Sequence, residues 1–447
     1  MVEADPLLRA SSRDPLKPPV KHSIIPLEVA AKPEPGSALG KLAKSLLLGQ
    51  LRKIRDGRLR LIDADFVETF GEITAAAPFD VTIRVRHPRF YSDVVLAGTL
   101  GSGEAYMNGY WDCDDLTALV RLMVINRHLM NDVDSGWSRL SAPLLRFAHW
   151  LNRNDRSGSR RNIAAHYDLG NKFFALFLDD TMAYSSGIFA HADASLLEAS
   201  TAKFDAACSK LDLKPGQHLL EIGTGWGGLA IHAAKNYGCR VTTTTISREQ
   251  YEFATESVAR AGLRGRITLL LEDYRDLKGE FDALVSIEMI EAVGDAYLDT
   301  YFRRCSGLLR ASGAMLLQSI TIRDQFYEQA RRSVDFIKRF IFPGSCIPSI
   351  QVLVNSLARA TDLKLFHMED IGPHYARTLK AWRERFLARQ AEVRALGYPE
   401  SFMRMWEFYL CYCEGGFEER QLGDVQMLLT KPRSRRASIA CVNAASA

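Results

Sequence analysis

Short apolar runs alternate with helical patterns through residues 218–322, and this alternation restricts the possible folds more than any other feature of the chain. Strand patterns cover residues 218–223, 239–246, 266–273, 281–291 and 314–322. Strands that alternate with helices form a parallel sheet covered on both faces, and such sheets bind ligands at the carboxyl ends of their strands. The sequence therefore predicts an α/β fold with a ligand site at this edge of the sheet.

A glycine-rich turn joins the first of these strands to the helix that follows it. The segment LLEIGTGWGGLAIHAA carries Gly223, Gly225, Gly227 and Gly228 shortly after Glu221. Glycine permits positive φ and lets a ligand approach the backbone, while the helix N-terminus presents free N–H groups. The spacing of three of these glycines also matches the dinucleotide pattern G-x-G-x-x-G, so a nicotinamide enzyme is an alternative.

The acidic residues around this turn favour a nucleoside ligand without a pyrophosphate. A dinucleotide site needs an acidic residue after the second strand, where this chain has Thr245 and Ile246. Instead, Glu221 precedes the glycines, and Glu272 and Asp273 end the third strand. We expect Glu221 near an amino acid group, the glycines against a ribose, and Asp273 or Glu272 toward an adenine amine.

The chain divides near residue 150. Strand patterns over residues 79–98 and a turn with a helix over 102–129 predict a small α+β domain spanning residues 38–150. Residues 1–37 are rich in proline and charge and have no apolar signal-peptide core, which predicts a disordered leader in a cytoplasmic protein. Residues 151–165 predict a basic linker, residues 166–430 the α/β domain, and residues 431–447 a basic disordered tail.

Composition and charge exclude several kinds of protein. No run reaches the roughly 20 apolar residues that span a bilayer. The net charge is +4 and no nucleic-acid motif is present, so we expect no nucleic-acid partner. Of the eight cysteines only Cys411 and Cys413 lie close together, which favours reduced thiols and no metal site. Residues 40–61 place seven cations among Leu and Ile at helical spacing, so they form either a solvated helix or a surface for anionic lipid.

Seven motifs occur in the order found in cyclopropane-fatty-acyl-phospholipid synthases and the related mycolic acid methyltransferases, which the chain resembles from about residue 166 to 429: HYDLGNKFFALFLDDTMAYSSGIF, LLEIGTGWGGLAIHAA, TTISREQ, LLEDYRDL, SIEMIEAVG, IFPGSCIPS and YLCYCEGGF. LGSGEAYMNGYWDCDDL resembles the N-terminal domain of the bacterial synthases. The resemblance implies a Rossmann-like methyltransferase domain with helical insertions that cover the substrate, preceded by a small α+β domain.

The resemblance also implies a reaction. It is transfer of a methyl group from S-adenosyl-L-methionine to the double bond of an unsaturated acyl chain in a membrane phospholipid, with closure to a cyclopropane ring. Alternatives are a methyl or methylene branch, or a catalytically silent protein that binds the cofactor or lipid. The enzyme would associate peripherally with the inner face of the membrane, and the small domain is a candidate for lipid docking or for forming a homodimer.

Matching motifs assign the cofactor site residue by residue. It comprises Tyr184, Ser185, Glu221, Gly223, Gly225, Gly227, Thr245, Ile246, Gln250, Asp273 and Tyr274.

In the family, a bicarbonate ion serves as the base and is held by a cysteine, a glutamate, a histidine, a tyrosine and a backbone amide. The matching positions here are Ser186, Glu291, Gln318, Tyr375 and Ile320. Serine and glutamine keep the capacity to donate hydrogen bonds, but glutamine cannot carry the positive charge of a histidine. Bicarbonate is therefore expected to bind more weakly, or the proton leaves in another direction.

Two further positions bear on this site. Glu288 lies three residues before Glu291, so the two can share a face and supply carboxylates, or they are exposed acids at a helix start. Ala292 stands where the synthases usually have a histidine. Cys413 matches the cysteine that is usually given as an active-site residue of the family. A thiol near the substrate need not act as a nucleophile, so we assign Cys413 a place in the site and no covalent chemistry.

Overall fold

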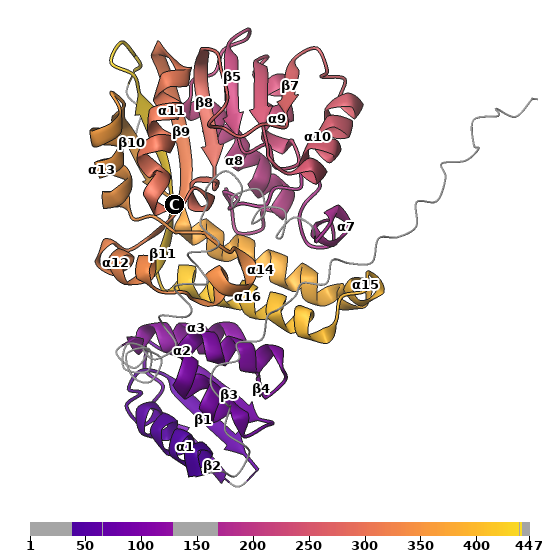
Figure 1. The fold of residues 1–447 in the computed structure, drawn as a ribbon. Coiled ribbons are helices and arrows are strands. Elements are labelled where there is room, and N and C mark those ends of the chain that lie inside the picture. Colours follow the sequence, from indigo (N-terminus) through magenta and orange to yellow (C-terminus); the bar gives the residue numbers. More distant parts are fainter. Residues whose placement is uncertain (1–37, 65, 128–168, 438, 440–447) are drawn as a thin grey trace, which may run out of the picture.

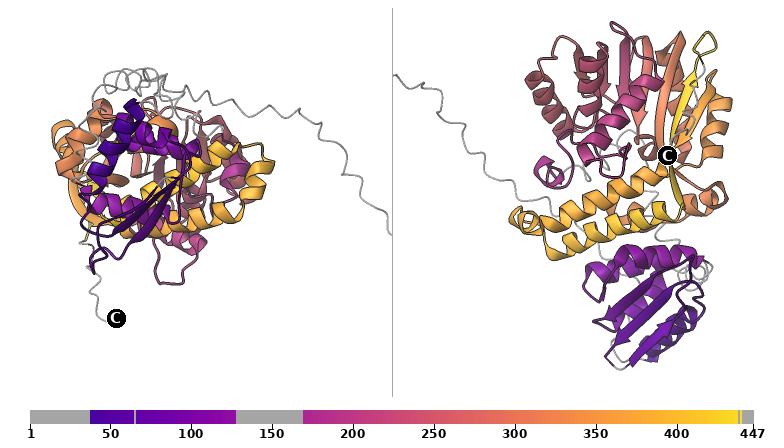
Figure 2. Two further views of the ribbon diagram at one scale, coloured as in Figure 1. Left: turned by 90° about the horizontal axis from the view of Figure 1, so that it is seen from below. Right: turned by 180° about the vertical axis from the view of Figure 1, so that it is seen from behind.

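The computed structural model describes residues 38–64, 66–127, 169–437 and 439. The predicted leader and the predicted basic linker lie outside the described residues. A small N-terminal domain and a larger α/β domain are separated by two long helices, α14 (Gly372–Ala388) and α16 (Glu400–Glu418), as Figures 1 and 2 show. Among the described residues, no helix combines the length and the apolar character that crossing a membrane requires.

The described part of the N-terminal domain is a four-stranded sheet with three helices. The strand order is β2-β1-β3-β4, in which β1 pairs antiparallel with β2 and parallel with β3. The elements in chain order are α1 (Ala38–Leu51), β1 (Arg58–Asp63), β2 (Phe66–Phe70), β3 (Asp80–Val85), α2 (Arg89–Met107), β4 (Trp111–Cys113) and α3 (Leu116–Ile125). This is the α+β domain that the fold prediction contains.

Two predictions for this domain are wrong in detail. The strand pattern predicted over residues 79–98 ends at Val85, because Pro88 lacks an N–H for a strand ladder and is tolerated at the start of a helix, where α2 begins. Residues 40–61 are not one helix, since they divide between α1 and β1. Several of the cations in this segment are paired, as Arg58 is with Asp80 and Lys44 is with Asp63.

The α/β domain contains a seven-stranded sheet in the order β10-β11-β9-β8-β5-β6-β7. The five strands β5 to β9 run parallel, β11 is antiparallel to β9, and β10 is antiparallel to β11. Their bounds are β5 (His218–Ile222), β6 (Arg240–Thr244), β7 (Ile267–Leu270), β8 (Phe281–Ile287), β9 (Leu309–Ile322), β10 (Lys364–Asp370) and β11 (Leu422–Thr430). The predicted Rossmann-like fold class is confirmed, and the two antiparallel strands are an addition to the prediction.

Helices cover both faces of this sheet, since alternate strand residues enter different cores. Leu220 and Leu284 pack with α11 and α13, whereas Leu219 and Val285 pack with α8 and α9. The helices are α7 (Asn171–Phe174), α8 (Leu196–Lys210), α9 (Gly228–Asn236), α10 (Arg248–Arg260), α11 (Leu298–Leu308), α12 (Asp324–Arg332), α13 (Ile350–Ala360) and α15 (Gln390–Ala395). Short helical turns are η1 (Ile290–Ala292), η2 (Asp295–Tyr297) and the π-helical η3 (Ile337–Ile341).

Helix α16 packs against the N-terminal domain. Arg404 on α16 donates to the backbone oxygens of Tyr106 at 2.5 Å and Trp111 at 2.7 Å. The packing is close, because a Cβ on Gly415 of α16 would lie 2.7 Å from a methyl group of Val120 on α3. The N-terminal domain is therefore fixed against the helices that cover the edge of the large sheet.

The predicted disordered tail begins with an ordered segment. The backbone N–H of Lys431 donates to the oxygen of Gly313 at 3.0 Å, and its ammonium group lies 2.7 Å from Asp362. Arg436 donates to the backbone oxygen of Leu211 at 2.7 Å. The basic side chains that suggested disorder thus find acceptors on the α/β domain, while residue 438 and residues 440–447 lie outside the described residues.

Candidate active site

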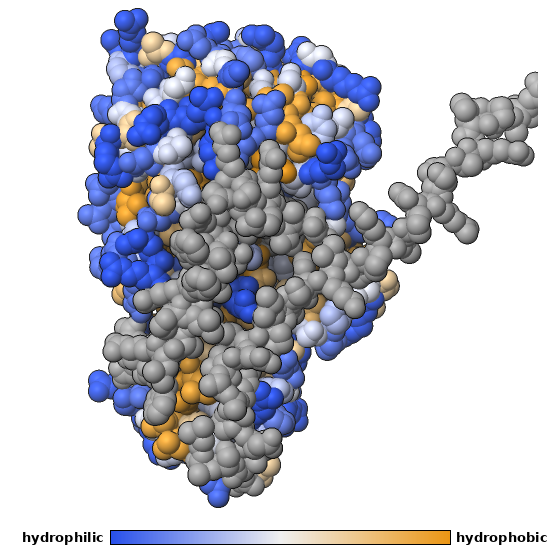
Figure 3. Space-filling view, viewed as in Figure 1, coloured by the Kyte–Doolittle hydropathy of each residue, from blue (hydrophilic) through white to orange (hydrophobic). Residues whose placement is uncertain are grey.

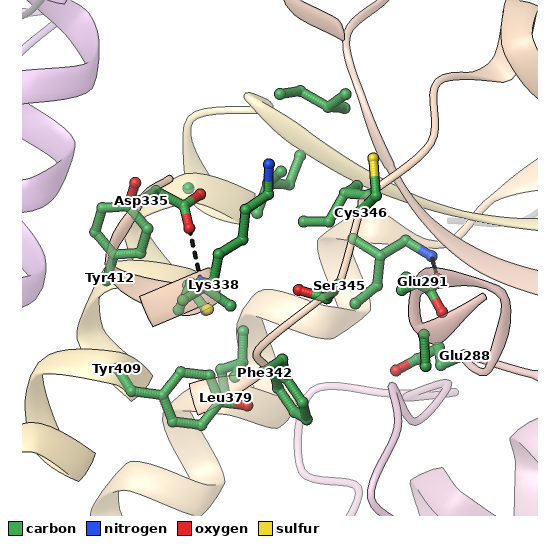
Figure 4. Close-up of a pocket in the computed structure, with 18 of the residues that line it drawn as sticks. Glu288, Glu291, Asp335, Lys338, Phe342, Ser345, Cys346, Leu379, Tyr409 and Tyr412 are labelled. Carbon is green, nitrogen blue, oxygen red and sulfur yellow. Dashed lines mark hydrogen bonds between the residues drawn. The ribbon is translucent and has the colours of Figure 1, made fainter. Parts of the chain in front are cut away.

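One cavity of about 950 Å³ reaches from the carboxyl edge of the large sheet to the N-terminal domain. Its wall includes the glycine turn, the residues that follow β8, the segment around η3, one side of α16, and parts of α1, α2 and α3. Figure 4 shows Glu288 and Glu291 at one side of the cavity, Tyr409 and Tyr412 at the other, and Phe342 between them. Asp335 and Lys338 lie beside Tyr412, so charged residues occur at both sides of this one continuous space.

The glycine turn leaves open space at one end of this cavity. Gly223, Gly225 and Gly227 have φ values of 101°, 52° and 94°, in the region that favours glycine. A Cβ on Gly225 would meet no heavy atom within 4 Å, and Gly225 lines the cavity. Gly227 does not line it, and a Cβ there would lie 3.3 Å from Ala254, so Gly227 serves the packing of α9 against α10.

The other predicted cofactor residues all line the cavity. Thr245 donates to the side-chain oxygen of Gln250 at 2.8 Å, which holds the end of β6 against the first turn of α10. Both carboxylate oxygens of Asp273 accept from the guanidinium group of Arg275, at 2.8 and 2.6 Å. This ion pair fixes the direction of Asp273 at the cavity wall.

A buried lysine that the sequence analysis missed stands beside the cofactor residues. Lys203 on α8 donates to the hydroxyl of Ser185 at 2.6 Å, and burial lowers the pKa of Lys203. Glu221 accepts from Thr243 at 2.5 Å, and burial raises the pKa of Glu221 to about 8 although the charge of Lys203 opposes this. A buried carboxylate of this kind can bind an amino group. The sequence signal for Lys203 was a charged residue on the apolar face of a helix.

Glu288, immediately after β8, collects three of the donors that were predicted to hold bicarbonate. One oxygen of its carboxylate accepts from the backbone N–H of Ser186 at 2.8 Å and from the side-chain amide of Gln318 at 2.7 Å. The other oxygen accepts from the hydroxyl of Tyr375 at 2.6 Å. Ser186 and Gln318 are fully buried and do not line the cavity, whereas Glu288 and Tyr375 do.

Glu291 takes the remaining predicted donor. One of its carboxylate oxygens accepts from the backbone N–H of Ile320 at 2.6 Å and from Ser319 at 3.1 Å. The other oxygen is buried and has no hydrogen-bond partner among the described residues. Burial, followed by the charge of Glu288, raises the pKa of Glu291 to about 8. The donors assigned to bicarbonate are thus engaged by two glutamates, and this arrangement does not fit a bound bicarbonate ion.

Glu288 and Glu291 both supply carboxylates to the cavity wall, but they do not lie on one helix. Glu288 has a φ of 48° and precedes the helical turn η1, whereas Glu291 lies within that turn. The backbone conformation therefore differs at the two residues. A third buried acid, Asp424 on β11, accepts from Gln318 at 3.0 Å. Burial and the neighbouring charges of Glu288 and Glu291 raise the pKa of Asp424 well above its usual range. An acidic residue within an apolar strand was the sequence signal for Asp424.

Cys413 on α16 lines the apolar part of the cavity. Burial raises the pKa of its thiol, so Cys413 is protonated at neutral pH and is a poor nucleophile. Tyr184, a predicted cofactor residue, shares a hydrogen bond of 2.9 Å with Tyr409. The side chains near Cys413 are therefore suited to contacting an apolar substrate and not to covalent chemistry.

Comparisons with known proteins agree with this geometry. The family described as mycolic acid cyclopropane synthetase matches residues 154–427. The chain is 38% identical over 362 residues to a cyclopropane-fatty-acyl-phospholipid synthase of Escherichia coli, covering 80% of this chain and 90% of that protein. It is also 38% identical over 341 residues to the tuberculostearic acid methyltransferase UfaA1 of Mycobacterium tuberculosis, covering 75% of this chain and 79% of that protein.

Two solved structures that resemble the α/β domain are also cyclopropane synthases. The cyclopropane synthase MmaA2 from Mycobacterium tuberculosis is 31% identical, with a TM-score of 0.57 over 61% of this chain and 98% of that chain. The mycolic acid cyclopropane synthase CmaA1, complexed with SAH and CTAB, is 32% identical with a TM-score of 0.57 over the same shares. With the fold, the open glycine turn and the buried acids in place, the chain belongs to the mycolic acid cyclopropane synthetase family of S-adenosylmethionine-dependent methyltransferases.

Proposed function

We propose that this enzyme methylates the double bond of an unsaturated acyl chain in a membrane phospholipid and closes the product to a cyclopropane ring. The observation that carries the proposal is the single cavity, which joins the cofactor turn to an apolar channel between the domains. Phe90 and Val94 from α2, Leu116 and Met123 from α3, and Phe408 from α16 line that channel. An acyl chain in it would place a mid-chain double bond near the cofactor turn.

The cofactor supplies an electrophilic methyl group when it is bound. An alkene is a weak nucleophile, so the protein must align the double bond with that methyl group and keep water away from the resulting carbocation. Tyr184, Phe342 and Tyr409 stand together, with ring centroids 6.4 Å apart for Tyr184 and Phe342 and 6.3 Å apart for Phe342 and Tyr409. Apolar rings keep water away, and aromatic faces attract a nearby positive charge. This cluster therefore suits a site in which a carbocation forms.

The N-terminal domain is suited to receiving the lipid. Leu42 and Leu46 on α1 are 48% and 42% exposed, and apolar side chains gather on the visible face of this domain over α1 in Figure 3. The same helix contributes Leu47 and Leu51 to the cavity wall. A membrane that contacts α1 would therefore lie next to the apolar end of the channel. We propose on this basis a cytoplasmic enzyme that docks peripherally on the inner face of the membrane.

The test is turnover of methyl-labelled S-adenosylmethionine on phospholipid vesicles. Label should enter lipids with unsaturated chains and not matched lipids with saturated chains, and mass spectrometry should show a gain of one methylene with the fragments of a ring. Binding of the cofactor without any transfer would contradict the proposal and favour a catalytically silent protein.

A branched product is the second candidate. The identity to the tuberculostearic acid methyltransferase equals that to the E. coli synthase, at 38%. A methylene branch has the same mass gain as a ring, so the fragment pattern separates the two products. A homodimer formed through the N-terminal domain stays a prediction, which sedimentation of the full chain would test.

A further inference from the structure

We infer that Glu288 is the base of the reaction, a carboxylate built into the chain at the place where the family resemblance calls for a bound bicarbonate ion. The inference rests on the proposed function, because it concerns the proton that leaves when the ring closes. The supporting observation is that Ser186, Gln318 and Tyr375 all donate hydrogen bonds to the Glu288 carboxylate.

The Glu288 carboxylate supplies what a bicarbonate would supply. It is a planar anion with oxygen lone pairs, and three donors fix its orientation. One oxygen accepts from the Tyr375 hydroxyl, and the other accepts from the backbone N–H of Ser186 and the amide of Gln318. Asp424 also interacts with this carboxylate, and both Glu288 and Tyr375 line the cavity in which the substrate is expected.

The backbone supports a role beyond packing. Glu288 has a φ of 48°, a conformation that is strained for a residue other than glycine. Strain of this kind persists where the surroundings hold the residue in place, and it concentrates at functional sites. At Glu288 the strained backbone directs the carboxylate onto donors that come from three separate parts of the chain.

The surrounding charges make Glu288 a stronger base than an exposed glutamate. Burial raises the pKa of Glu288, whereas the Tyr375 hydrogen bond and the charge of Lys203 oppose the rise. Glu291 and Asp424 are buried beside it and add repulsion when ionised. A carboxylate with a raised pKa holds an abstracted proton more firmly, which favours proton transfer in the transition state.

The step balances as follows. One C–H bond of the newly attached methyl group breaks, and its electron pair forms the ring bond to the cationic carbon. The proton goes to the Glu288 oxygen that accepts from Tyr375, and Glu288 becomes a neutral carboxylic acid. When the product leaves, water entering the cavity takes this proton and restores the carboxylate.

The first experiment measures turnover on vesicles of unsaturated phospholipid in buffer freed of carbon dioxide, with and without added bicarbonate. The wild type should be indifferent to bicarbonate. Glu288→Gln keeps the shape of the side chain but removes the base, so turnover should fall by about 10²- to 10⁴-fold, while the affinity for S-adenosylmethionine is retained. Glu256→Gln, at an exposed site on α10, is the matched control.

The second variant, Glu288→Gly, restores a residue that tolerates the positive φ and frees the three donors. Added bicarbonate or formate should then recover turnover in Glu288→Gly but not in Glu288→Gln, where the amide still fills the space. Bicarbonate labelled with ¹³C, observed by NMR, should bind Glu288→Gly and not the wild type. This measurement does not depend on turnover.

Three results would overturn the inference: a wild type that requires bicarbonate, a wild type that binds it at this place, or an unchanged rate in Glu288→Gln. Failure of the proposed function looks different, because the wild type would then transfer no label to any lipid although it binds the cofactor.

Discussion

The cofactor end of the cavity is built from backbone, whereas the end around Glu288 is built from side chains. At the first, Gly223 and Gly225, both with positive φ, line the cavity within one short turn. At the second, the donors to Glu288 stand 102, 30 and 87 residues away from it in the chain. The first end therefore depends on a single strand-to-helix turn, and the second depends on the whole tertiary fold.

This difference determines how each end can change. A backbone cradle loses its space when almost any side chain is added, so it tolerates little variation. A side-chain network can exchange one member for another of similar shape without disturbing the fold. Gln318 and Glu288 illustrate such an exchange, because a side-chain donor persists at position 318 while the anion that it contacts has become part of the chain.

The largest effect is expected at the backbone end. In Gly225→Asp, the new carboxylate would occupy the open space of the turn, in the cavity that the buried Glu221 also lines. An uncompensated buried charge costs about 3 kcal/mol or more, so the affinity for S-adenosylmethionine should fall by about 100-fold or more. Isothermal titration measures this, with Gly265→Asp as control, because Gly265 is exposed and also has open space. Equal affinities in both variants would remove the glycine turn from the cofactor site.

The next effect is on the pH dependence of kcat/KM and kcat. The two profiles differ because the cofactor bound at one end changes the pKa values of the carboxylates at the other. Burial raises the pKa of Glu288, and burial with the charge of Glu288 raises the pKa of Glu291 to about 8. A base with a raised pKa loses its ionised form as pH falls, so kcat/KM should decrease by about tenfold per pH unit below the pKa of the free enzyme. The cation of the bound cofactor favours ionised carboxylates, so kcat should fall only at lower pH. Coincident profiles for kcat and kcat/KM would contradict this.

The contrast between the two ends also explains what could be predicted from the sequence. Strands β5 to β9 and the glycine turn follow from local patterns, which a single segment contains in full. The pairing of Glu288 with Tyr375 could not be predicted, because β10 and α14 must first return the chain to the sheet edge. Asp424 and Gln318 meet only because β11 pairs with β9, and nothing in either segment alone specifies that pairing.

A smaller effect is expected at the exposed side of α1 in the N-terminal domain, which carries neither the glycine turn nor Glu288. Leu42→Ser and Leu46→Ser on α1 should each weaken binding to vesicles about fivefold, since inserting part of a leucine into lipid contributes about 1 kcal/mol. Leu197→Ser is the matched control, because Leu197 is 40% exposed but lies on α8 of the α/β domain. Co-sedimentation with vesicles measures the binding. An equal loss in Leu197→Ser would show that α1 is not a specific docking surface.

The smallest effect is expected for Ser186→Cys, which restores the residue type that the family resemblance calls for. Ser186 contacts Glu288 through its backbone N–H, which the substitution retains, while its hydroxyl donates to the oxygen of Gly187 at 3.0 Å. Weakening that one buried hydrogen bond costs about 0.5 kcal/mol, so turnover should fall by only about two- to threefold. The lipid product should stay the same, because Glu288 still occupies the place of the anion. Turnover on vesicles and lipid mass spectrometry measure both quantities. A gain in rate that depends on added bicarbonate would show that a thiol at position 186 recruits the ion, and it would place the base outside Glu288.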